Sequence, residues 1–88
     1  HVHPAAVALA VRVKSPARVM AITDGTAVAG MPVGTPGRLG PARIVAGPSS
    51  ALLDDGTLAG STTTMDAAFR YLVREVGVPL TSAARLCA

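Results

Sequence analysis

A short apolar run that ends on a carboxylate constrains the fold of this chain more than any other feature. Residues 18–23 are apolar almost throughout, and Asp24 follows them directly. A run of this kind is typical of a strand that is buried on both faces of a parallel sheet. Residues 4–14 precede it with the Ala, Val and Leu content of a buried helix, and Ser15-Pro16 separates the two. Helix, tight turn and buried strand make up the repeating unit of α/β proteins.

Asp24 is the sharpest candidate for chemistry in the chain. An acid at the C-terminal tip of a buried strand is held rigidly at the mouth of a barrel or sheet. There it can act as a general base and acid, or as a metal ligand, if its surroundings tune its pKa. The alternative is that Thr23-Asp24-Gly25 is only a turn that ends the strand, because Asp and Gly favour turns.

The middle of the chain predicts a long loop and a small hairpin. Residues 25–41 are dense in Gly and Pro, which indicates a loop of the length that often serves as a lid or binding loop. Two short apolar runs, residues 42–46 and 50–53, flank Gly47-Pro48 and predict a β-hairpin, and Asp55-Gly56 is a strong turn dipeptide.

The C-terminal third predicts two helices. Apolar residues recur at helical spacing along one stripe: Met65, Ala68, Phe69, Leu72, Val73 and Val76. Gly77 and Pro79 should end this helix, and Thr81 or Ser82 can cap a last one. The preceding residues 58–62 could bind a polar ligand through backbone amides and hydroxyls at the helix start, or could be an ordinary hydroxyl-rich helix N-terminus.

Composition points to a piece of a larger protein. The 88 residues are half hydrophobic, yet they include one Phe, one Tyr and no Trp, so few large side chains are available for a core. The chain opens on His1 without a Met or a signal peptide and stops at Ala88 within a helical pattern, so neither end resembles a natural terminus.

Charge, cysteine content and hydropathy argue against several classes of protein. The net charge is +3, but the basic residues are scattered without interleaved aromatics, which argues against a nucleic-acid partner. No apolar stretch has the length of a membrane span, and the expected location is the cytoplasm. Cys87 is alone, so no disulfide or cysteine metal site is expected.

His1-Val2-His3 is an alternating histidine pair. On an extended segment both rings would lie on one face, which suits a metal or a polar substrate. The motif is weak, and its place at the start of the chain could equally be an accident of where the chain is cut.

The order of these segments resembles the C-terminal part of N-acetylglucosamine-6-phosphate deacetylases, which belong to the amidohydrolase superfamily. The resemblance extends over essentially the whole chain and preserves order and spacing, and the run from Asp55 to Ser61 joined to Thr-Met-Asp is its most specific part. It rests on these segments: His1-Val2-His3-Pro4, Thr23-Asp24, Ala29-Gly30-Met31-Pro32, Asp55-Gly56-Thr57-Leu58-Ala59-Gly60-Ser61 and Thr64-Met65-Asp66-Ala67.

The resemblance implies a role for five residues. Asp24 matches the aspartate that activates the metal-bound water and then protonates the leaving amine. His1 matches the histidine that contacts the substrate near the scissile amide, and Ala59, Gly60 and Ser61 match the loop that touches the sugar. His3 falls where family members vary, so no role is carried onto it.

The resemblance also implies the fold, the cofactor and the partners. The fold class would be α/β, with residues 1–88 forming part of a (β/α)8 metal-dependent hydrolase barrel: the last helix–strand units, a loop hairpin and C-terminal helices. The divalent metal would be held by a glutamate and two histidines that lie outside this chain. The partners would be a phosphorylated amino sugar, the rest of the barrel and, since family members commonly form dimers, a second subunit.

Departures from the family pattern leave alternatives open. Gly25 replaces a common alanine, and Thr63 stands where Leu is frequent. With the metal ligands missing, the isolated chain should be inactive. The alternatives are another amidohydrolase, such as a dihydroorotase-like enzyme or a deaminase, and a non-enzymatic fragment that folds only by association.

Overall fold

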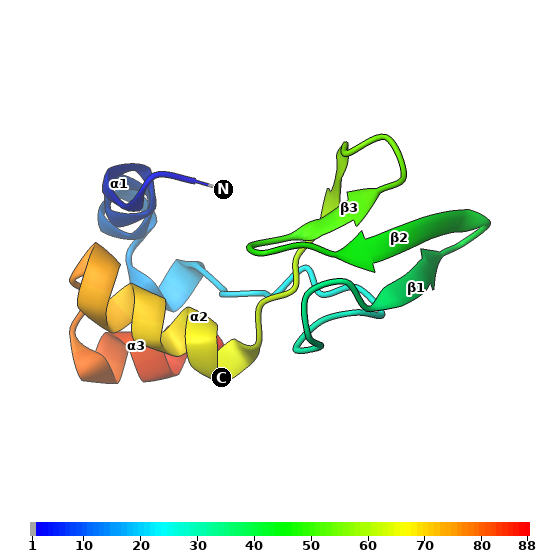
Figure 1. The fold of residues 1–88 in the computed structure, drawn as a ribbon. Coiled ribbons are helices and arrows are strands. Elements are labelled where there is room, and N and C mark those ends of the chain that lie inside the picture. The colour runs from blue at the N-terminus through cyan, green and yellow to red at the C-terminus, as the bar shows by residue number, and fades with distance from the viewer. Residues whose placement is uncertain (1) are drawn as a thin grey trace. The chain divides into compact units, whose positions relative to one another are not determined.

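The computed structural model describes residues 2–88, which form two compact units. A helical unit combines the N-terminal segment through Ile22 with Met65–Ala88, and a sheet unit consists of Thr23–Thr64. Within the described residues the helices and the four-stranded sheet give the α/β composition that the sequence predicts (Figure 1).

Helix α1 spans Pro4–Lys14, as predicted. His3 is its N-cap, because the Nδ1 atom of His3 accepts a hydrogen bond from the Ala5 backbone N–H at 3.1 Å. Pro4 fits the first helical position, where its missing N–H leaves no bond unmade. The prediction that this helix is buried is wrong for this chain, since Val11 is its buried residue while Leu9 and Val13 are exposed.

Residues 18–23 do not form the predicted strand of a parallel sheet. Pro16–Arg18 is a short 3-10 helix, and the chain then runs extended without a neighbouring strand along residues 19–22. Its side chains alternate: Val19 and Ala21 pack on the helical core, whereas Met20 and Ile22 are 77% and 69% exposed. Val19 has the dihedral angles of a strand, but a sheet needs a neighbouring strand, and residues 2–22 and 65–88 contain none. The Ala21 N–H donates instead to the Leu86 carbonyl of helix α3 at 2.8 Å.

Helix α2 begins at Met65 and runs to Tyr71, and a wider π-helical turn continues it over Leu72–Val76. Gly77 ends the helix with φ 83°, the left-handed conformation predicted for a terminal glycine. The Leu72 carbonyl accepts hydrogen bonds from the backbone N–H groups of both Gly77 and Val78, the latter at 2.9 Å.

Helix α3 spans Leu80–Cys87 and lies beside α2 (Figure 1). Pro79 is its N-cap and makes no side-chain capping bond. The predicted cap at Thr81 or Ser82 is wrong, because the helix begins earlier.

The buried core of the helical unit contains one residue of α1 and four from the C-terminal segment: Val11, Leu72, Val78, Ala83 and Leu86. Phe69, Val73 and Val76 pack against this core, as the apolar stripe predicts.

The sheet unit is an antiparallel meander of four strands, β1 to β4 in sequence order (Figure 1). The hairpin of β2 (Ala42–Ala46) and β3 (Ala51–Leu53) confirms the one predicted around Gly47-Pro48. Two further strands were predicted as loop, β1 (Pro36–Leu39) and β4 (Leu58–Gly60).

The loop predictions failed because Gly and Pro do not prevent an edge strand from forming. Gly40, with φ 58°, makes the tight turn that joins β1 to β2. At Gly37 a Cβ would lie 2.7 Å from Val28 Cγ1, so the bare backbone lets the edge strand pack on the core residue Val28. The rest of this second core is Ile44, Ala46 and Ala51.

We predict that Leu86→Ala lowers the free energy of unfolding of the 88-residue chain by about 2–5 kcal/mol, because Leu86 is 1% exposed and its loss leaves a cavity. Leu80, in the same helix, is 62% exposed, so Leu80→Ala is the matched control and should change stability by about 0.5 kcal/mol or less. Urea denaturation followed by circular dichroism measures both. Equal losses in the two variants would contradict this core assignment.

The Asp55-Gly56 turn joins β3 to β4, as its sequence predicts. The Thr57 hydroxyl, and then the Thr57 backbone N–H at 2.9 Å from Asp55 Oδ1, lower the pKa of the Asp55 carboxyl below its ordinary value. Because the pKa of Asp55 is lowered in the folded state, the hydrogen bonds from Thr57 stabilise the folded chain at pH values above the unfolded-state pKa. This contribution is lost as the pH falls through the folded-state pKa.

We predict that Thr57→Val raises the pKa of Asp55 toward its ordinary value, because the variant keeps the shape of the side chain but loses the hydroxyl donor. Thr57→Ser keeps the hydroxyl and should leave the pKa lowered. An NMR titration of the Asp55 carboxyl carbon in the three chains measures the difference. If the valine and serine variants titrated alike, the hydroxyl would not be the cause.

Candidate functional site

Two segments of the sheet unit that are far apart in sequence run side by side at Asp24 and Ser61. Gly25 and Ser61 form a parallel β-bridge. The Ser61 backbone N–H donates to the Asp24 carbonyl at 3.0 Å, and the Thr26 backbone N–H donates to the Ser61 carbonyl at 3.1 Å. The structure therefore brings together the candidate catalytic residue and the candidate substrate loop, which the family resemblance assigns to one active site.

Asp24 is exposed and lies in the left-handed region with φ 50°, a conformation that Asp tolerates better than most residues. Its backbone carbonyl is held by Ser61. Within residues 2–88 its carboxylate has no hydrogen-bond or ion-pair partner. The backbone is thus fixed while the acid stays free to meet a ligand, and the turn interpretation and the catalytic interpretation of Asp24 are compatible.

The loop residues Ala59, Gly60 and Ser61 are half-buried, and the first two belong to strand β4. The Ser61 Oγ accepts a hydrogen bond from the Thr63 backbone N–H at 2.8 Å. A hydroxyl carries one donor proton besides its acceptor lone pairs, so the Ser61 O–H can still donate to a ligand. The interpretation of these residues as a helix N-terminus is wrong, because Ala59 and Gly60 belong to a strand that pairs with β3, Ser61 bridges to Gly25, and α2 begins only at Met65.

Gly60 is a site of close backbone approach. Its φ is 155°, and a Cβ at this position would lie 2.7 Å from Thr26 Cγ2. The absence of a side chain therefore lets the strand end lie directly against the segment that follows Asp24. A further hydrogen bond ties the two segments together, from the Gly30 N–H to the Thr62 carbonyl at 3.0 Å.

Sequence reasoning missed Thr26, which contacts both Gly60 and Ser61. A threonine after a Gly in a Gly/Pro-rich segment carries no local signal of such a contact, since its partner lies 35 residues away.

The two histidines have different outcomes. His1, the candidate substrate contact, lies outside the described residues. His3 is exposed and its Nδ1 atom caps helix α1. The second histidine of the His1-Val2-His3 motif therefore has a structural role.

Residues 2–88 contain no group of three His, Cys, Asp or Glu side chains that could hold a metal ion. Asp24 alone offers an unengaged carboxylate at the candidate site, which suits it to face a metal centre built by other residues rather than to form one. Among the described helices, none is long and apolar enough to cross a bilayer.

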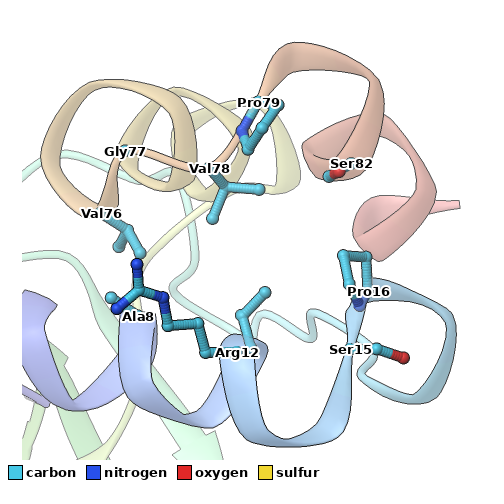
Figure 2. A pocket seen from close by; sticks show the side chains of 10 residues that line it. Ala8, Arg12, Ser15, Pro16, Val76, Gly77, Val78, Pro79 and Ser82 are labelled. Carbon is cyan, nitrogen blue, oxygen red and sulfur yellow. The ribbon is translucent and has the colours of Figure 1, made fainter.

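The helical unit has a separate open hollow of about 640 Å³ (Figure 2). It is mostly apolar, Arg12 is its charged lining residue, and Ser15 and Ser82 supply hydroxyls. A second hollow in the same unit is lined by residues of the helical core together with Met20 and Ile22. Neither hollow is lined by Asp24 or by the loop of Ala59, Gly60 and Ser61, so neither is the candidate site.

Comparison with solved structures confirms the family resemblance along the whole chain. An N-acetylglucosamine-6-phosphate deacetylase from Pasteurella multocida matches 99% of the chain with a TM-score of 0.86 and 29% identity. A mutant N-acetyl-D-glucosamine-6-phosphate deacetylase from Mycobacterium smegmatis, solved in complex with N-acetyl-D-glucosamine-6-phosphate, matches 98% with a TM-score of 0.81 and 37% identity. The enzyme from Thermotoga maritima matches 91% with a TM-score of 0.76 and 29% identity.

The chain spans about a fifth of the length of these enzymes, since it covers 22%, 23% and 22% of the three. No family model matches the sequence. No curated protein matches it either.

We predict that Gly60→Ala destabilises the sheet unit by about 1–3 kcal/mol, because the new methyl would meet Thr26 in a backbone conformation that L-residues rarely adopt. Gly25→Ala is the matched control on the other segment of the bridge. A Cβ there would lie 3.2 Å from Thr23 Oγ1 and 3.5 Å from Ala29 Cβ, so small adjustments accommodate it. Denaturant midpoints measure both variants, and a neutral Gly60→Ala would refute the close approach.

Proposed function

We propose that this chain is the part of an N-acetylglucosamine-6-phosphate deacetylase that carries the catalytic aspartate, Asp24, and one side of the sugar pocket. The observation that carries the proposal is the match along nearly the whole chain to three such enzymes, one of them solved with N-acetyl-D-glucosamine-6-phosphate bound. The pairing of Asp24 with Ser61 also supports it, because the chemistry needs an acid next to a substrate-contacting loop.

The proposed reaction is hydrolysis of the acetamide, in which water attacks the carbonyl carbon and the C–N bond breaks to give acetate and the free amine. Asp24 would take a proton from the attacking water and deliver it to the leaving nitrogen. An exposed carboxylate without a protein partner is suited to both transfers, because no hydrogen bond must break first. A divalent ion, held by residues outside this chain, would lower the pKa of the water and polarise the carbonyl.

Ala59, Gly60 and Ser61 would contact the sugar, together with His1 from the start of the chain. The Ser61 backbone N–H is already committed to the Asp24 carbonyl, so the Ser61 hydroxyl is the donor that can reach a sugar oxygen. Since the same residue bonds to the Asp24 backbone and would contact the sugar, it would hold the bound sugar beside the acid.

The rest of a (β/α)8 barrel would be the partner of this chain, with residues 1–88 as a partial domain within it. Large apolar side chains that a free protein would cover are exposed, among them Leu9, Val13, Met20 and Ile22. In a barrel, residues 19–22 would gain the lateral strands that they lack here, which accounts for their extended conformation. A homodimer stays a prediction from the resemblance, and a cytoplasmic location stays a prediction from the sequence.

We predict that the full-length protein releases acetate from N-acetylglucosamine 6-phosphate and that a chelator abolishes the release. Asp24→Asn should lower kcat by about a hundredfold or more, because the amide keeps the shape of the side chain but cannot shuttle the proton. The 88-residue chain alone should release no acetate, because it lacks the metal ligands.

Asp54→Asn is the matched control, since Asp54 is also exposed but lies in the turn between β3 and β4. Its kcat should stay near that of the wild type. If the Asp24→Asn enzyme kept the kcat of the wild type, the catalytic interpretation would be wrong and Asp24 would be only a turn residue. A folded, metal-loaded wild type without acetate release would favour another amidohydrolase substrate.

A further inference from the structure

Thr26 is the residue whose side chain connects the Asp24 segment to the candidate substrate loop. Its hydroxyl donates to the Ser61 carbonyl at 3.2 Å, beside the bond that its own backbone N–H makes to the same oxygen at 3.1 Å. Its Cγ2 methyl faces Gly60 at the position where a Cβ would lie only 2.7 Å away. One side chain thus contacts two of the three loop residues.

These two contacts need threonine specifically. Any residue at position 26 could make the backbone hydrogen bonds between the segments, but only threonine supplies both the hydroxyl donor and the methyl group. A serine would keep the donor and leave the space over Gly60 unfilled, whereas a valine would fill the space and lose the donor. Because a β-branched side chain has few χ1 rotamers, a single rotamer holds both contacts at once.

The hydroxyl bond is also partly shielded from water, since Thr26 and Ser61 are both half-buried. Removing the donor would leave the Ser61 carbonyl with one partner fewer in a place where water competes poorly. Ser61 would then be held by the backbone bonds alone, and the loop would sample more positions relative to Asp24.

We propose that Thr26 is a positioning residue of the deacetylase, which sets the substrate loop of Ala59, Gly60 and Ser61 in register with Asp24. The proposal rests on the function proposed above. Thr26 touches no reacting atom itself. Its side-chain contacts end on Gly60 and Ser61 rather than on Asp24, so its loss weakens substrate binding more than the chemical step.

The test compares Thr26→Val with Thr26→Ser in the full-length enzyme, with N-acetylglucosamine 6-phosphate as the substrate. Thr26→Val should raise KM by about threefold to tenfold, the worth of one partly buried hydrogen bond, while kcat stays within about threefold. Thr26→Ser keeps the donor and should restore KM to within about twofold of the wild type. Melting temperatures of all variants distinguish a selective rise in KM from general destabilisation of the enzyme.

Two further variants make the outcome decisive. Thr35→Val is the matched control, because the Thr35 hydroxyl makes a local bond to the Pro32 carbonyl at 2.7 Å without reaching the loop of Ala59, Gly60 and Ser61, and its KM should not change. Thr26→Ala removes the donor without adding a methyl, and it replaces Thr26→Val if that variant fails to fold.

An unchanged KM in the valine or alanine variant, or an equal rise in the serine variant, would overturn the positioning role while leaving the proposed function intact. A wild-type enzyme that neither binds nor hydrolyses the substrate would overturn the proposed function and this inference with it.

Discussion

The backbone pairing of residues 24–26 with Ser61 is the interaction on which the candidate site depends. Three hydrogen bonds are made there, two from backbone N–H groups and one from the Thr26 hydroxyl. Each is worth only about 0.5–1.5 kcal/mol, but together with the bond from the Gly30 N–H to the Thr62 carbonyl they fix the separation of the two segments. The pairing is possible because Gly60 has no side chain to keep the backbones apart.

This pairing also explains the conformation of Asp24. The residue must turn so that its carbonyl meets Ser61 while its carboxylate stays exposed, and the left-handed backbone at φ 50° achieves both. A non-glycine residue in this region stores some strain, which is tolerated where the surrounding bonds determine the position. A fixed backbone that carries an exposed carboxylate would suit the proton transfer proposed for Asp24.

The balance of buried and exposed apolar side chains in this chain is that of a segment that further parts of a protein would stabilise. Its largest side chains with almost no exposure are Leu86 and Val28, one in each unit. Many large apolar side chains stay in contact with water, including Met20 and Ile22 on one face of the extended segment. A full barrel would bury these side chains and supply the strands that residues 19–22 lack, so the same surface that weakens the isolated chain would stabilise the whole enzyme.

The sequence by itself determined the local elements. Helix α1, the helix from Met65 to the Gly77 stop, the hairpin around Gly47-Pro48 and the Asp55-Gly56 turn are all encoded within a few residues, by apolar periodicity, by proline and glycine at helix ends and by turn dipeptides. The family resemblance was also readable, because it rests on short motifs in a fixed order.

Only the tertiary structure decided what pairs with what. It paired β1 and β4, which the sequence presented as loop, it left residues 18–23 without a sheet, and it set Asp24 and Thr26 against Ser61. The physical reason is that a strand or a contact of this kind takes its stability from hydrogen-bond partners distant in sequence. Which segment supplies those partners depends on the folded arrangement and not on the residues nearby.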